Sequence, residues 1–176
     1  RNPTREESRI REPEIRMGTA NGQLKKVLVV CTGNTCRSPM AAGWLNRKLA
    51  GKGWTAESAG VAAWGGGSAS PEAVEAMREI GIDVSGHRSR PLTKALVDGA
   101  DIILAMTEGH RREIAHRFPE AKNRTFLVHG FGVEPARDVA DPVGLPVEAY
   151  RHTRDELIRA LGEFLLYLSE RGELGT

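Results

Sequence analysis

Residues 27–39 read Val-Leu-Val-Val-Cys-Thr-Gly-Asn-Thr-Cys-Arg-Ser-Pro, an apolar run followed by a small polar loop. The run Val27–Val30 shows no alternation with polar residues, which is typical of a parallel strand buried on both faces. Ser38 is a favourable N-cap and Pro39 suits a first helical position, so a helix is expected to begin there. The loop amides and the positive end of the helix dipole would then point into one concavity. The stretch therefore predicts an anion-binding loop.

Cys31 ends the predicted strand, and Arg37 follows it after a short loop. Gly33 permits the tight turn that would bring the two side chains to one point. A helix N-terminus and a nearby cation favour the thiolate, which is the nucleophilic form of cysteine. A guanidinium can hold two phosphoryl oxygens at once, which lysine cannot do. An isolated cysteine is more often a small buried apolar residue, but the strand, the glycine and the helix start favour a cysteine-dependent phosphatase.

The run Val-Cys-Thr-Gly-Asn-Thr-Cys-Arg-Ser-Pro-Met-Ala, residues 30–41, resembles the signature of the low-molecular-weight protein tyrosine phosphatase family. The resemblance extends from residue 26 to about residue 168. It implies Cys31 as nucleophile and Arg37 as the residue that holds the phosphoryl group, with no metal and no cofactor. The implied phosphate-binding loop also contains Thr32, Gly33, Asn34, Thr35, Cys36 and Ser38.

Residues 130–145 form a long segment that contains Asp141-Pro142. Long connections in compact domains are often functional, and a phosphatase needs a group that protonates the leaving atom and then activates water. An Asp-Pro pair by itself is more typical of a plain turn. The family resemblance implies Asp141 as this acid and base, and Asp138 is the alternative.

The remaining chain alternates strand and helix patterns, which predicts an α/β fold. Strands are expected at 27–30, 54–59, 100–106 and 125–128, and helices from 39 to about 49, 70 to 81, 108 to about 116 and 146 to about 171. The expected architecture is a three-layer αβα domain, Rossmann-like, with a four-stranded parallel sheet and helices on both faces. Its ligand site should lie at the carboxyl ends of the strands, where Cys31 lies.

Several positions bear on the pocket and on the substrate. Trp64, beside three glycines, is interpreted as an exposed pocket wall, although a lid over a small local core is the plainer interpretation. Val143 stands where the family commonly has an aromatic residue. The resemblance implies that His87 helps to hold Asn34. With Thr35 before the second cysteine, the loop resembles that of the protein arginine phosphatase branch. In that branch the matching threonine narrows the pocket and selects a guanidinium phosphate.

Phosphotyrosine and phosphoarginine therefore both remain candidate substrates, carried by a phosphorylated protein. Two other classes are considered. An arsenate reductase on the same fold would need further cysteines to relay a disulfide, and a phosphate-binding module without catalysis would lack the acid. His110, His116 and His129 show no metal-ligand spacing and receive no chemical role.

Composition limits the remaining possibilities. A chain of 176 residues with a net charge of +2 favours one domain and gives no global field for nucleic acid or a membrane surface. Residues 1–24 are expected to form a charged tail, with 1–16 as an extension before Met17, and residues 25–172 a single phosphatase domain. Neither a membrane span nor a signal peptide is evident, so a cytoplasmic location is expected.

Cys31 and Cys36 are the only cysteines, which excludes a disulfide framework and a four-cysteine metal site. A reversible disulfide between these two, protecting Cys31 from irreversible oxidation, is a further hypothesis. Replacing Cys36 with serine and measuring recovery of activity after peroxide would test it.

Overall fold

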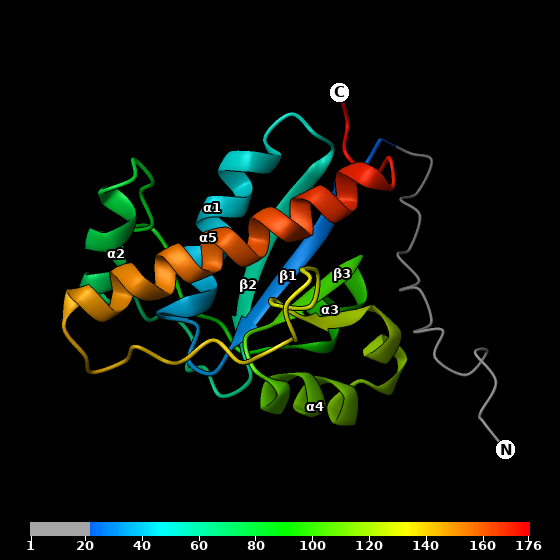
Figure 1. Cartoon of the computed structure of the whole chain (residues 1–176). Coiled ribbons are helices and arrows are strands. Elements are labelled where there is room, and N and C mark those ends of the chain that lie inside the picture. Colours follow the sequence, from blue (N-terminus) through cyan, green and yellow to red (C-terminus); the bar gives the residue numbers. More distant parts are fainter. Residues whose placement is uncertain (1–21) are drawn as a thin grey trace, which may run out of the picture.

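The central strand of the protein is β1 (Lys25–Cys31), which pairs in parallel with a neighbour on each side. The structure is a computed structural model that describes residues 22–176. The strand order is β2-β1-β3-β4, with β2 at Trp54–Gly60, β3 at Ile102–Ala105 and β4 at Thr125–Leu127. Figure 1 shows β1 between β2 and β3. All three pairings are parallel, so the predicted four-stranded parallel sheet is confirmed.

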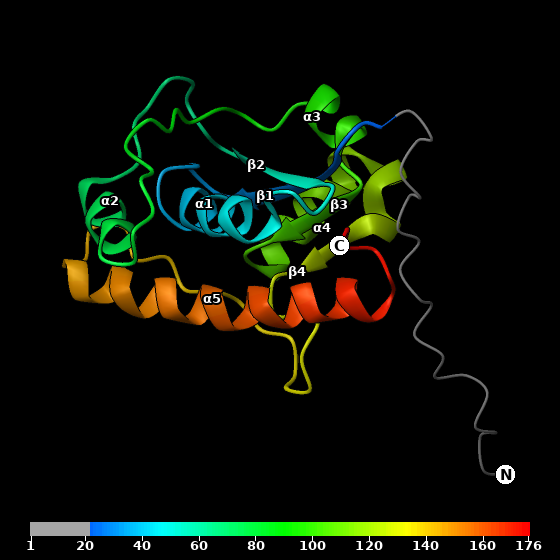
Figure 2. The ribbon, with the colours of Figure 1, turned by 90° about the horizontal axis from the view of Figure 1, so that it is seen from above.

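Helices cover both faces of this sheet, as predicted. They are α1 (Arg37–Leu49), α2 (Pro71–Arg78), α3 (Lys94–Gly99), α4 (Glu108–Arg117), a 3-10 helix (Pro119–Arg124) and α5 (Val147–Glu170). In the view of Figure 2, α5 runs along one side of the sheet and α3 lies on the other.

Burial on both faces explains the uninterrupted apolar sequence of β1. Val27 and Val29 belong to the core cluster that includes residues of α1 and α5. Leu28 and Val30 belong to the second cluster, with residues of α3 and α4. Each of these side chains is therefore buried. A strand in which apolar and polar residues alternate would bury its polar side chains in one of the two clusters.

Helix α1 begins earlier than the sequence suggests. Its first residue is Arg37, and Cys36 occupies the N-cap position without a side-chain cap hydrogen bond. The prediction of Ser38 as N-cap is therefore wrong. The Ser38 hydroxyl lies within the first turn and contacts Cys31 and Asn34 instead.

Two short elements, α3 and the 3-10 helix, were not predicted, because six residues carry too little periodicity to show a helix. Residues 1–21 of the predicted tail lie outside the described residues. At the other end, Glu173 forms an ion pair with Lys25, and its carbonyl oxygen accepts a hydrogen bond of 2.8 Å from Trp54 Nε1. Within residues 22–176, no helix combines the length and the apolar character needed to cross a membrane.

Candidate active site

The loop between β1 and α1 is organised by Asn34, whose φ of 57° lies in the left-handed region. Asparagine tolerates this conformation better than most residues. Its side-chain amide donates hydrogen bonds to Ser38 Oγ (2.8 Å) and Ser58 Oγ (2.9 Å). Its Oδ1 accepts a hydrogen bond of 3.0 Å from the backbone N–H of Arg90. One buried side chain therefore ties the loop to α1, to β2 and to the segment that precedes α3.

His87 supports the same asparagine, as the family resemblance implied. Its Nε2 lies 2.7 Å from the backbone oxygen of Asn34. Burial lowers the pKa of His87, although the hydrogen bond to Asn34 acts in the opposite direction. Because an acceptor oxygen faces Nε2, this nitrogen carries the proton of the neutral ring.

Cys31 lies at the bottom of the loop with 2% of its surface exposed. Its Sγ is 2.9 Å from Ser38 Oγ and accepts a hydrogen bond of 3.3 Å from the backbone N–H of Asn34. Both cysteines are free thiols. The Ser38 hydroxyl, the Asn34 N–H and the N-terminus of α1 therefore surround the sulfur.

Arg37 is buried beside this sulfur, with 4% of its side chain exposed. Its Nη1 donates a hydrogen bond of 2.9 Å to the Val139 carbonyl, and its Nη2 lies 3.3 Å from Asp141 Oδ2. Nε has no hydrogen-bond partner within residues 22–176 and is buried. Residues of the 128–146 segment, here called the acid loop, thus hold the guanidinium on one side. Its Nε–H remains as a donor for an anion.

These side chains surround a pocket of about 200 Å³. Its lining consists of Cys31, Thr32, Gly33, Thr35, Cys36, Arg37, Asp141 and Val143. Trp64 is not among the lining residues, and 90% of its surface is exposed. The structure thus brings together the predicted nucleophile, cation and carboxylate, with Val143 at the wall.

The two candidate carboxylates occupy different environments. Asp141 lines the pocket, contacts Arg37, and accepts a hydrogen bond of 3.1 Å from the Val143 N–H. Asp138 instead accepts a hydrogen bond of 2.8 Å from the N–H of Glu108, the first residue of α4. Asp138 therefore satisfies a helix N-terminus, which leaves Asp141 as the carboxylate that faces the sulfur pocket.

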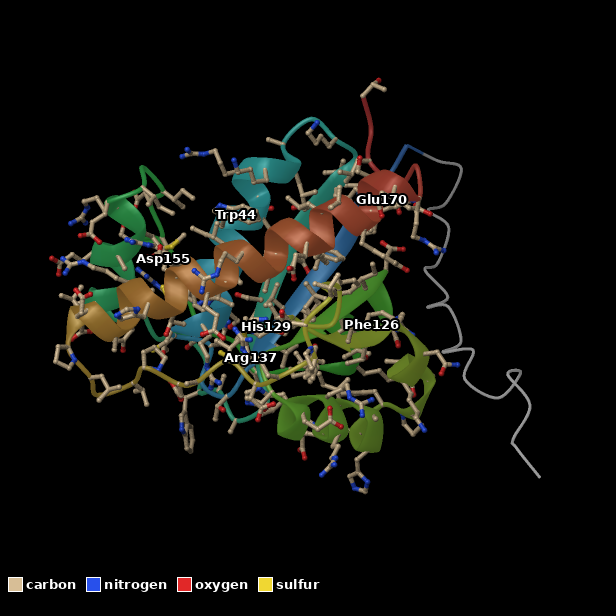
Figure 3. All side chains as sticks on the ribbon, in the orientation of Figure 1. Trp44, Phe126, His129, Arg137, Asp155 and Glu170 are labelled. Atoms are coloured by element: carbon tan, nitrogen blue, oxygen red, sulfur yellow. The ribbon has the colours of Figure 1, made fainter. Side chains whose placement is uncertain are left out.

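A cluster outside the pocket attaches the acid loop to α5. His129 Nε2 lies 2.7 Å from Glu156 Oε1, and Arg137 Nε lies 3.7 Å from the same oxygen. Figure 3 labels His129 and Arg137, which lie close together beside α5. His129, to which no chemistry was assigned, thus has a structural contact that joins the acid loop to α5.

Two contacts with the phosphate-binding loop were not predicted. Tyr150 of α5 places its hydroxyl 3.4 Å from Cys36 Sγ, and burial raises the pKa of Tyr150 to about 12. His110 of α4 places Nε2 at 2.8 Å from Thr32 Oγ1. The only sequence signal for His110 is its position just after β3, the strand next to β1, since the ends of adjacent parallel strands share one edge.

Comparison with known proteins places this geometry in a family. The model of the family described as "Low molecular weight phosphotyrosine protein phosphatase" matches residues 26–174. The chain belongs to this family. It is a cysteine-dependent phosphatase on the α/β fold that the sequence predicted.

Individual members of the family and its relatives carry different activities in their names. A protein-arginine-phosphatase of Geobacillus stearothermophilus is 50% identical over 133 residues, which are 75% of this chain and 88% of that protein. The solved structure of a low molecular weight protein tyrosine phosphatase from T. tengcongensis is 44% identical with a TM-score of 0.78, covering 82% of this chain and 99% of that chain. Arsenate reductase 2 of Staphylococcus haemolyticus is 33% identical over 140 residues, which are 80% of this chain and 95% of that protein.

Proposed function

We propose that this phosphatase hydrolyses a phosphorylated protein side chain through a phosphocysteine on Cys31, with Asp141 as general acid and base. The observation that carries the proposal is the shared pocket of Cys31, Arg37 and Asp141, in which the sulfur accepts hydrogen bonds and the guanidinium has a buried donor without a partner in the described chain. Among residues 22–176, no group of three His, Cys, Asp or Glu side chains has the arrangement of a metal site.

In the first step the Cys31 thiolate attacks phosphorus as the bond from phosphorus to the leaving atom breaks. Arg37 and the loop amides hold the phosphoryl oxygens, and Asp141 gives its proton to the leaving atom. In the second step water attacks the phosphocysteine while the Asp141 carboxylate takes a proton from it. The sulfur–phosphorus bond breaks, inorganic phosphate leaves, and the Ser38 hydroxyl stabilises the re-formed thiolate at 2.9 Å.

Single substitutions at the two carboxylates test the assignment of the acid. Asp141→Asn should lower kcat for an aryl phosphate by roughly 100-fold or more, which is the usual contribution of general acid catalysis. Asp138→Asn is the matched control, because Asp138 accepts its hydrogen bond from the start of α4 and asparagine keeps an acceptor oxygen for it. A larger loss of kcat in Asp138→Asn than in Asp141→Asn would contradict the assignment, and turnover by Cys31→Ala, which has no nucleophilic atom there, would contradict the covalent step.

Phosphoarginine is the substrate that the pocket supports best. Thr35 lines the pocket, as the resemblance to the arginine phosphatase branch implied, and the relative with 50% identity is named for that activity. Val143 offers no aromatic ring on which a phosphotyrosine ring could stack. Phosphotyrosine is the second candidate, because Trp64 presents an exposed ring and a solved tyrosine phosphatase is 44% identical.

Turnover of a phosphoarginine peptide and a phosphotyrosine peptide of the same sequence would decide between the two substrates. Wild type should prefer phosphoarginine, and Thr35→Ile should shift the ratio of kcat/KM toward phosphotyrosine. An unchanged ratio in Thr35→Ile would contradict the role of Thr35 in selectivity.

Arsenate reduction lacks support in the residues themselves. The chain contains only Cys31 and Cys36, both at the loop, and no further cysteine after Cys36 to relay a disulfide. Thioredoxin-coupled reduction of arsenate would contradict this argument.

A reactive free thiol is best maintained in a reducing compartment, which supports a cytoplasmic location.

A further inference from the structure

The hydrogen bond between Thr32 and His110 connects the phosphate-binding loop to α4. Thr32 lines the pocket, and its Oγ1 lies 2.8 Å from His110 Nε2. His110 is held in place at the start of α4, because its backbone N–H donates a hydrogen bond of 3.1 Å to the N-cap hydroxyl of Thr107. Its surface is only 7% exposed. A buried ring at a fixed helix position can orient a hydroxyl more precisely than a mobile surface residue can.

The position of the proton on His110 follows from its surroundings. Nδ1 is buried and has no hydrogen-bond partner within the part of the chain that the structure describes. A buried N–H without an acceptor is rarer than a buried acceptor without a donor, so the neutral ring carries its proton on Nε2. His110 therefore donates to Thr32 Oγ1.

The neutral state of the ring also has a structural cause. Burial lowers the pKa of His110 to about 4, and the nearby Arg37 guanidinium acts in the same direction. Asp138 and Asp141 of the acid loop act in the opposite direction and are outweighed. At neutral pH the ring thus carries a single N–H proton, which it donates to Thr32 Oγ1.

A hydroxyl that accepts a hydrogen bond from His110 must donate its own proton in another direction. Because Thr32 lines the pocket beside Cys31 and Arg37, that direction includes the pocket interior. We propose that His110 is a positioning residue that fixes the Thr32 hydroxyl as a hydrogen-bond donor to a phosphoryl oxygen. This role rests on the proposed phosphatase function and adds one side-chain donor to the loop amides and Arg37.

Competitive inhibition by inorganic phosphate tests the proposal without reference to the natural substrate. The inhibition constant is measured with an aryl phosphate as reporter. Thr32→Val removes the hydroxyl at nearly constant shape, and His110→Phe removes the orienting donor. Each should raise the inhibition constant roughly 10-fold, the usual effect of losing a hydrogen bond to a charged acceptor.

Two further variants separate positioning from packing. His110→Gln keeps an N–H donor near the place of Nε2, so it should restore most of the phosphate affinity that His110→Phe loses. His116→Phe, at an exposed position of the same helix, is the matched control and should leave the inhibition constant unchanged. Failure of His110→Gln to restore affinity would contradict the proposal.

The double variant Thr32→Val/His110→Phe gives the decisive comparison, even if His110→Phe perturbs folding. If His110 acts through Thr32, His110→Phe should have little further effect once the hydroxyl is absent. Equal effects of His110→Phe in both backgrounds would overturn the proposal. If phosphate does not inhibit wild type, the proposed function is contradicted, and this role with it. If phosphate inhibits wild type and the inhibition constant of Thr32→Val is the same, only the role of Thr32 is contradicted.

Discussion

The burial of His110 predicts a specific dependence of stability on acid. In the unfolded chain the ring takes up a proton near its ordinary pKa of 6.5, but in the folded protein burial and Arg37 lower that pKa to about 4. A group with a depressed pKa in the folded state favours folding above the unfolded pKa. That advantage is lost as the pH falls toward the folded pKa. The free energy of unfolding should therefore decrease between pH 6.5 and pH 4.

The size of this decrease follows from the two pKa values. A change from 6.5 to about 4 corresponds to roughly 3 kcal/mol once the pH lies below both pKa values. Between pH 7 and pH 5 the same calculation gives about 2 kcal/mol. For a domain of this size, 2 kcal/mol corresponds to a decrease of about 4–8 °C in Tm.

Urea denaturation of wild type and His110→Gln at pH 7 and pH 5 measures this effect. Other groups titrate in both proteins, so the informative quantity is the difference between their pH dependences. His110→Gln should lose less stability on acidification than wild type, by about 2 kcal/mol. Identical pH dependences for the two proteins would refute the assignment of a buried, neutral His110.

Three further predictions concern the same region. Arg37→Lys should lower kcat roughly 100-fold or more, because an ammonium cannot hold two phosphoryl oxygens; activity measured beside the surface variant Arg47→Lys checks this. Gly60→Ala would place a Cβ 2.4 Å from a backbone oxygen of the phosphate-binding loop. It should cost about 2 kcal/mol of stability in a urea titration. Gly65→Ala, with no heavy atom within 4 Å, should be nearly neutral, and equal losses would count against the clash. In an absorbance titration at alkaline pH, the difference between wild type and Tyr150→Phe should appear only near pH 12; ionisation near pH 10 would contradict its burial.

The sequence predicted those parts of the structure that depend on local pattern. The run Val27–Val30 indicated a central strand because it is apolar on both faces, and the sheet confirmed it. The start of α1 was misplaced because a serine hydroxyl that satisfies a helix in most contexts is engaged here by Cys31. Local propensity gives no information about such a competing tertiary contact.

Contacts between distant segments for which the resemblance implied no role could not be predicted from the sequence. His110 shows no partner at any local spacing, and its contact with Thr32 exists because β3 lies beside β1 in the sheet. Asp138 and Asp141 lie in one long loop, and only the resemblance of Asp141-Pro142 to the family motif separates them in the sequence. The structure separates them by their contacts, because Asp138 accepts from the Glu108 N–H whereas Asp141 lines the pocket and contacts Arg37.

The anchors of the phosphate-binding loop come from different strands, and this distribution bears on substrate choice. Asn34 is tied to β2 through Ser58, and Arg37 contacts the acid loop after β4. At Thr35 the anchor is the backbone, whose carbonyl accepts a hydrogen bond of 2.9 Å from the Ser70 N–H. The Thr35 hydroxyl makes only a weak contact, 3.7 Å from the Sγ of the adjacent cysteine. The side chain at position 35 can therefore change without loss of a loop anchor. Thr35→Ile should thus alter which phosphorylated side chain enters the pocket, while Cys31 and Arg37 keep their geometry.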